Sequence, residues 1–139
     1  MKVIKFTVGC AVALLATLVA PAYAQHHDHG HAHGEKKDLG TTTIAGLKLT
    51  VSQLGTITPG GEGAFEIQIG RGQPKPKAIR LWVGIPSGEG SVKSKASSDS
   101  EDYDVHVEIP KTLPENSRLW VEVEPATGKK FKLGLGLKK

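Results

Sequence analysis

The chain of 139 residues has little of the sulfur and aromatic chemistry that many enzymes and copper carriers use, with one Cys, one Met and 5% aromatic residues. Both sulfur residues, Met1 and Cys10, lie at the N-terminus. The rest of the chain therefore has no thiol, no disulfide and no thioether ligand. It also lacks a His-Glu-x-x-His and a Gly-x-Ser-x-Gly motif, and we expect no enzymatic activity.

Long apolar runs are scarce as well. The one long run, residues 8–20, is shorter than the about 20 residues that cross a bilayer as a helix. Lys2 and Lys5 precede it and a small-x-small sequence at residues 22–24 follows it, which is the layout of a secretory signal peptide. We therefore expect removal of residues 1–24, leaving a periplasmic or secreted protein that does not span a membrane.

A strong excess of one charge is also missing. The 18 basic residues become 16 without Lys2 and Lys5, against 14 acidic residues, so residues 25–139 have a net charge of +2 with His neutral. Binding of nucleic acid requires a concentrated basic face. The small net charge therefore argues against nucleic acid as a partner.

Apolar and polar residues alternate along much of the chain after residue 42. The segments with this alternation are residues 47–51, 65–69, 79–85, 103–109, 119–123 and 131–137. A period of two predicts strands with one buried face and one face in water. A weaker segment at residues 91–97 contains two lysines, which suit a seventh strand at a sheet edge.

Turn-forming residues separate these segments. They cluster at residues 59–61, 70–76, 86–88, 110–116 and 125–128. The last cluster predicts a hairpin that places Glu122 and Glu124 across from Lys130 and Lys132. We predict an all-β domain at residues 43–139, an antiparallel immunoglobulin-like sandwich of about seven strands. An open barrel is the alternative.

Histidine is concentrated between the predicted signal peptide and this domain. Five of the six histidines lie in the stretch QHHDHGHAHG, at His26, His27, His29, His31 and His33. The stretch has no apolar residue larger than Ala, so we predict that residues 25–42 are a disordered tail and linker. Neutral imidazole binds Cu(II), Zn(II) and Ni(II), and Asp28 adds an oxygen donor. The tail is therefore predicted to bind a transition metal ion, and a solvated polar tail is the alternative.

Cleavage after Ala24 would create a second site at the new N-terminus. The free amine, two backbone amide nitrogens and the imidazole of the third residue, His27, form a square-planar nitrogen set. This geometry suits Cu(II) or Ni(II). Cyclisation of Gln25 would remove the amine.

His106 is the one histidine of the predicted domain, between Asp104 and Glu108 on the outward face of its strand. These donors predict a further metal site if a neighbouring strand or the tail adds a ligand. The alternative is an exposed polar face.

Trp82 and Trp120 are both out of phase with the aliphatic residues of their strands. If both point outward, they form a platform for a protein or glycan partner, because Trp is frequent on such surfaces. The alternative is that the rings pack flat against Lys and Arg side chains on the outer face of a sheet.

Four stretches resemble small exported bacterial proteins that have a His-rich N-terminus and an all-β domain and are associated with heavy-metal efflux systems. The stretches are residues 26–33, 77–84 (KAIRLWVG), 87–93 (SGEGSVK) and 103–110 (YDVHVEIP). The resemblance implies a metal-handling role in the cell envelope. The chain is also similar in plan to periplasmic copper-carrier sandwiches, although it lacks their Met ligands.

Together these features predict a monomeric protein that buffers Cu(II), Zn(II) or Ni(II), or delivers the ion to an efflux or uptake component. The alternative function is an immunoglobulin-like interaction module for a protein or glycan, with incidental metal binding by the tail.

Overall fold

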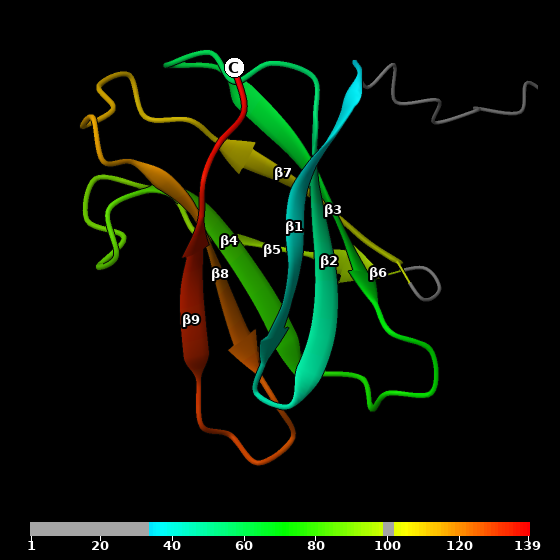
Figure 1. Ribbon diagram of the computed structural model, residues 1–139. Coiled ribbons are helices and arrows are strands. Elements are labelled where there is room, and N and C mark those ends of the chain that lie inside the picture. Colours follow the sequence, from blue (N-terminus) through cyan, green and yellow to red (C-terminus); the bar gives the residue numbers. More distant parts are fainter. Residues whose placement is uncertain (1–33, 99–101) are drawn as a thin grey trace, which may run out of the picture. The chain divides into compact units, whose positions relative to one another are not determined.

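The computed structural model describes residues 34–98 and 102–139 (Figure 1). Within these residues the chain forms nine strands: β1 (Lys36–Ile44), β2 (Leu47–Leu54), β3 (Glu62–Ile69), β4 (Ala78–Gly84), β5 (Ser94–Lys95), β6 (Ser97–Ser98), β7 (Asp102–Glu108), β8 (Arg118–Glu124) and β9 (Phe131–Leu135). No helix occurs in this part of the chain, and hence none that is long and apolar enough to cross a membrane.

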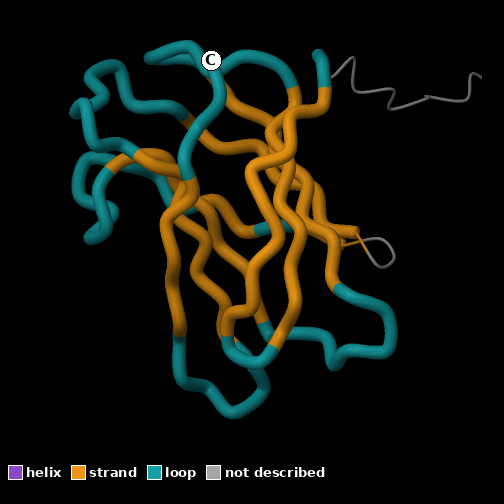
Figure 2. Tube along the Cα trace, viewed as in Figure 1, coloured by secondary structure: helices purple, strands orange, loops and turns teal. Residues whose placement is uncertain are grey.

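The strands form two antiparallel sheets that pack against each other as a sandwich. The five-stranded sheet has the order β1-β2-β3-β7-β6, and the four-stranded sheet has the order β5-β4-β8-β9. The four-stranded sheet lies on the left in Figure 1 and the five-stranded sheet on the right. Loops connect the strands at both ends of the sandwich (Figure 2). The predicted all-β class is confirmed, and two separate sheets replace the alternative of an open barrel.

The predicted alternation of buried and exposed side chains is confirmed along β3, β7 and β8. In β7, for example, Tyr103, Val105 and Val107 are buried, whereas Asp104 and His106 are exposed. In β4 every residue except Arg80 is buried, and in β9 no residue is buried, so the alternation predicted for these two strands is not found. The largest fully buried apolar side chains between the sheets are Phe65, Leu49, Ile67, Ile79, Leu81, Ile109, Leu119, Val51, Val83 and Val107. Burial of each such side chain stabilises the fold by about 1.5–3 kcal/mol.

The first strand begins earlier than the sequence predicts. β1 starts at Lys36, inside the segment 25–42 that was predicted to be a disordered linker. It pairs with β2 along its whole length, from Lys36 opposite Leu54 to Ile44 opposite Leu47. Only Ile44 is buried among the residues of β1, so the strand carries no clear apolar alternation. β1 is therefore held in place by backbone pairing with β2 and not by burial of its side chains.

The predicted edge strand at residues 91–97 is two short strands in different sheets. β5 pairs with β4, and β6 pairs with β7. Ala96, between them, is buried in the core and its N–H donates to the carbonyl of Ile79 at 2.9 Å. The chain therefore crosses from one sheet to the other at Ala96. With β1 and this division, the described residues form nine strands instead of about seven.

Gln53 ties the C-terminal segment to β2. Its side chain is fully buried on the core side of the strand. The side-chain Nε2 donates to the carbonyls of Gly55 at 2.9 Å and Lys138 at 2.8 Å, and Oε1 accepts from the N–H of Lys138 at 3.0 Å. Because Lys138 follows the last strand of the other sheet, these bonds join the two sheets at one edge.

Replacing Gln53 by Leu should lower the free energy of unfolding, measured by urea denaturation, by about 0.5–1.5 kcal/mol for each hydrogen bond that is lost. The amide of Lys138 should also exchange its hydrogen faster. Gln68→Leu, at an exposed position of β3, is the control and should change stability by less than about 0.5 kcal/mol. Equal effects of the two substitutions would show that Gln53 does not join the sheets.

Candidate functional site

The predicted metal ligands of the tail lie outside the residues that the structure describes. They are His26, His27, Asp28, His29, His31 and His33. His106 is the sequence-predicted histidine ligand that can be placed.

His106 lies on the outer face of β7, as predicted, and contacts a carboxylate of the neighbouring strand. Its Nδ1 is 2.6 Å from Oε1 of Glu62 in β3. Among residues 34–98 and 102–139, no three His, Cys, Asp or Glu side chains come close enough together to hold a metal ion. Asp104 and Glu108 therefore do not complete the metal site predicted around His106 within the described part of the chain.

The outer face of the five-stranded sheet is acidic around this histidine. Glu62 lies opposite Glu108, and Glu66 lies opposite Asp104. Like charges directly opposite each other on two strands destabilise a sheet. A basic group accompanies one member of each pair: the imidazole described above contacts Glu62, and Nζ of Lys36 is 2.5 Å from Oε1 of Glu66.

Trp82 and Trp120 lie side by side on the outer face of the four-stranded sheet. They are directly opposite each other in β4 and β8, with ring centroids 6.3 Å apart and ring planes 18° from parallel. Each indole N–H is bonded within the chain at 2.9 Å, Trp82 to the carbonyl of Ile85 and Trp120 to the carbonyl of Gly84. Their outward orientation, predicted from the strand phase, is confirmed.

Trp82 is nevertheless fully buried, because a loop and a lysine cover its ring. Gly88 approaches so closely that a Cβ there would lie 3.4 Å from Nε1 of Trp82, and its φ of +78° also favours glycine. Nζ of Lys93 lies 4.3 Å from the ring centroid, a cation–π distance. This is the predicted packing of Trp against a basic side chain. A partner cannot reach the ring of Trp82 in this conformation, whereas Trp120 is half-buried.

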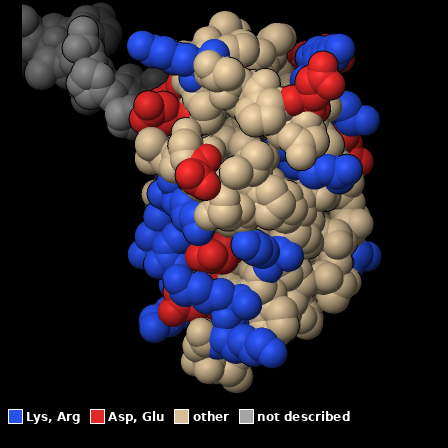
Figure 3. Space-filling model, turned by 90° about the vertical axis from the view of Figure 1, so that its left-hand side faces the viewer, with Lys and Arg blue, Asp and Glu red and all other residues tan. Residues whose placement is uncertain are grey.

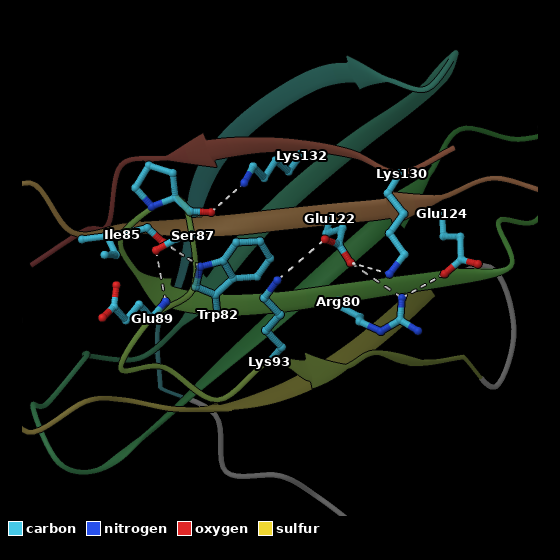
Figure 4. Close-up of polar contacts among 11 residues, drawn as sticks. Arg80, Trp82, Ile85, Ser87, Glu89, Lys93, Glu122, Glu124, Lys130 and Lys132 are labelled. Atoms are coloured by element: carbon cyan, nitrogen blue, oxygen red, sulfur yellow. Dashed lines mark hydrogen bonds and ion pairs between the residues drawn. The ribbon is translucent and has the colours of Figure 1, made fainter. Parts of the chain in front are cut away.

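Glu122 in β8 holds three cations on this face (Figure 4). Its carboxylate is 3.6 Å from Nζ of Lys130 and 3.8 Å from both Nη1 of Arg80 and Nζ of Lys93. The side chain of Glu122 is 12% exposed. The carboxylate thus lies beneath the cations that it binds.

Glu124, at the end of the same strand, has two cationic partners of its own. Nζ of Lys77 lies 3.0 Å from Oε1, and Nη1 of Arg80 lies 3.1 Å from Oε2. Hydrogen bonds from Lys77 and then Arg80 hold the pKa of the Glu124 carboxyl below its ordinary value, and the opposing effect of burial is smaller. Arg80 therefore bridges the two carboxylates of β8.

Basic side chains gather over this face, with carboxylates between them (Figure 3). The predicted hairpin at residues 125–128 is confirmed, and Glu122 lies opposite Lys132. Sequence reasoning did not identify Arg80 and Lys77 as partners of the glutamates. The pairing of β4 with β8 brings them together, and the one available signal was the alternation of Arg80 with aliphatic residues in β4.

No protein-family model, curated protein or solved structure matches this chain. What the protein does must therefore follow from its own residues.

Replacing Trp82 by Phe should lower the free energy of unfolding by about 1–3 kcal/mol, because a smaller ring replaces the fully buried indole and its hydrogen bond to the carbonyl of Ile85 is lost. That carbonyl keeps the N–H of Gly88, at 3.0 Å, as a donor. Urea denaturation measures the change. Trp120→Phe removes the corresponding N–H from a half-buried position and should cost less. If Trp82→Phe left stability unchanged, the bond to Ile85 would not be what holds the loop over the ring.

Glu124→Gln should destabilise the protein at neutral pH and have little effect in acid. The folded-state pKa of Glu124 is depressed, so its contribution is complete above the ordinary carboxyl pKa and is lost as the pH falls through the folded value. Thermal unfolding of both proteins at about pH 7 and about pH 3 measures the difference. A difference that stayed the same at both pH values would contradict the role of the ionised carboxylate.

Proposed function

We propose that this protein is an exported, monomeric metal-binding protein whose histidine segment, residues 26–33, captures Cu(II), Zn(II) or Ni(II). The observation that carries the proposal is that five of the six histidines of the chain lie in this segment. His27, His29, His31 and His33 recur at every second residue, and Asp28 adds an oxygen donor. Several imidazoles within so few residues can share one ion, and imidazole suits all three metals.

The expected export of the chain fits this role. A positively charged start, an apolar stretch and a small-x-small sequence are the parts of a secretory signal at residues 1–24. Cleavage there would leave the histidine segment at the new N-terminus. With His27 as the third residue, the amine and amide nitrogens would add a square-planar site for Cu(II) or Ni(II).

Capture and release would follow from the chemistry of imidazole. Histidine binds metal in its neutral form, so protons compete with the ion as the pH falls below about 6.5. Release would occur in acid or by exchange with ligands of a partner, such as an envelope efflux or uptake component. The protein would then buffer the ion or deliver it, with no chemical reaction of its own.

The β-sandwich is proposed as an immunoglobulin-like carrier of this segment. Apart from β1, its sheets have the orders β2-β3-β7-β6 and β5-β4-β8-β9. These correspond to the A-B-E-D and C′-C-F-G orders of immunoglobulin sheets. Domains with this architecture commonly present surfaces to partners, so partner binding by the sandwich alone is the second candidate function. The ordered layer of cations over Glu122 and Glu124 is the observation that favours it.

Calorimetric titration of residues 25–139 with Cu(II), Zn(II) and Ni(II) should show binding at about pH 7.4 that weakens at about pH 5.5. A variant with Ala in place of the five histidines of residues 26–33 should lose that binding. Urea denaturation of the variant, unchanged from that of the parent, would show that the sandwich is intact.

His106→Ala is the matched control, because it removes the remaining histidine and should leave the affinity unchanged. If His106→Ala lost metal binding and the variant without the five histidines of residues 26–33 kept it, the metal site would lie in the sandwich. Absence of binding tighter than competition by the buffer would reject the metal-binding function altogether.

A further inference from the structure

The outer face of the four-stranded sheet carries a group of positively charged side chains. Its cations are Lys77, Arg80, Lys93, Lys95, Arg118, Lys130 and Lys132, and we call this set the cation layer. We propose that the cation layer docks on a bilayer surface rich in anionic phospholipid headgroups. The proposal goes beyond metal capture and does not depend on it.

Strand register places these side chains on one face. Lys95 lies opposite Arg80 in β4, and Arg80 and Lys132 both lie opposite Glu122 in β8. Residues directly opposite each other point to the same side of a sheet. Arg118 also lies on this side, because a Cβ on Gly134 would meet its Cδ at 3.1 Å and the ring of Trp120 at the same distance.

The cations stand above their carboxylates. Lys77 is 66% exposed and Lys130 is 51% exposed, whereas Glu124 and Glu122 are 11% and 12% exposed. An approaching surface therefore meets ammonium groups first. Seven cations face Glu122, Glu124 and, in the loop over Trp82, Glu89, an excess of four positive charges, although residues 25–139 carry a net charge of only +2 (Figure 4).

The opposite face of the sandwich is acidic along β3 and β7. The outer side of the five-stranded sheet carries Glu62, Glu66, Asp102, Asp104 and Glu108 on β3 and β7. Such an asymmetry would orient the molecule, with the cation layer toward an anionic surface and the acidic face away from it. Charge complementarity thus selects one face for docking.

A lipid surface fits this face better than an acidic protein does. Five of the seven cations are lysines, which act as hydrated point charges rather than as forks that match a particular carboxylate. The layer covers a broad face rather than a deep hollow (Figure 3).

Sedimentation with vesicles tests the proposal, using residues 25–139, which contain every described strand. Vesicles of phosphatidylcholine with about 30 mol% phosphatidylglycerol should bind the protein, and binding should fall steeply between about 0.1 M and about 0.5 M salt. Vesicles of phosphatidylcholine alone should bind little. Addition of EDTA should leave vesicle binding intact, and so should replacement of the five histidines of residues 26–33 by Ala. These two controls distinguish vesicle binding from metal binding.

Lys77→Gln combined with Lys130→Gln should lower the partition coefficient about fivefold for each lysine, or about 25-fold together. Lys36→Gln combined with Lys48→Gln removes the same charge from the other sheet and should have little effect. Lys77→Arg with Lys130→Arg keeps the charge and should keep the binding, which distinguishes lost charge from lost folding.

Three results would overturn the proposal. The first is equal binding to vesicles with and without phosphatidylglycerol. The second is an equal loss in the two glutamine double variants. The third is full binding of the Lys77 and Lys130 glutamine variant. Tight, salt-dependent binding to soluble polyglutamate with none to vesicles would also reject a lipid surface and indicate an acidic protein partner.

Discussion

The positions of the charged side chains on the outer face of the four-stranded sheet depend on the carboxylate of Glu122. It lies close under the surface, 12% exposed, between Arg80 and Lys93 at 3.8 Å and Lys130 at 3.6 Å. Without this negative charge, Arg80 in β4, Lys93 before β5 and Lys130 before β9 would repel one another. The carboxylate therefore allows these cations to lie close together on one face. Isolated surface ion pairs contribute little, but a network around one shielded carboxylate constrains several side chains together.

The same network explains the position of Trp82. A Trp on the outer face of a sheet would leave a large apolar area in water, but Lys93 lies over the ring and binds Glu122 as well. The indole N–H is satisfied by Ile85 in the loop that covers it. The apolar part of the Trp82 side chain is therefore removed from water, although it lies outside the core between the two sheets.

Much of the fold follows from local patterns in the chain, and what does not follow depends on contacts between distant segments. Alternation predicted the core-facing residues of β2, β3, β4, β7 and β8, because the aliphatic side chains of each strand lie on one side. β1 has no such alternation and is ordered by pairing with β2, so the predicted linker ended seven residues too late. The crossing at Ala96 escaped prediction because a single small buried residue leaves no periodic signal.

The candidate site was predictable to a similar extent. The phase of Trp82 in its strand showed that it points away from the core, but its burial depends on Gly88 and Lys93, which reach it from the following loop. The outward position of His106 was predicted from alternation, while its partner Glu62 comes from a strand 44 residues away in the chain. The side of a strand to which a side chain points is set locally, by the alternation along the chain. Its exposed fraction and its contacts depend on the other strands and loops of the folded domain.

The two proposed activities would respond differently to acid, which gives the molecule two independent controls. Imidazole binds metal in its neutral form, so the proposed site of residues 26–33 would release metal as the pH falls. Ammonium and guanidinium groups in general lose their protons only at much higher pH. Glu124, with its lowered pKa, stays ionised in mild acid and continues to hold Lys77 and Arg80 in place. A mildly acidic compartment would therefore release the metal from a protein that remains docked.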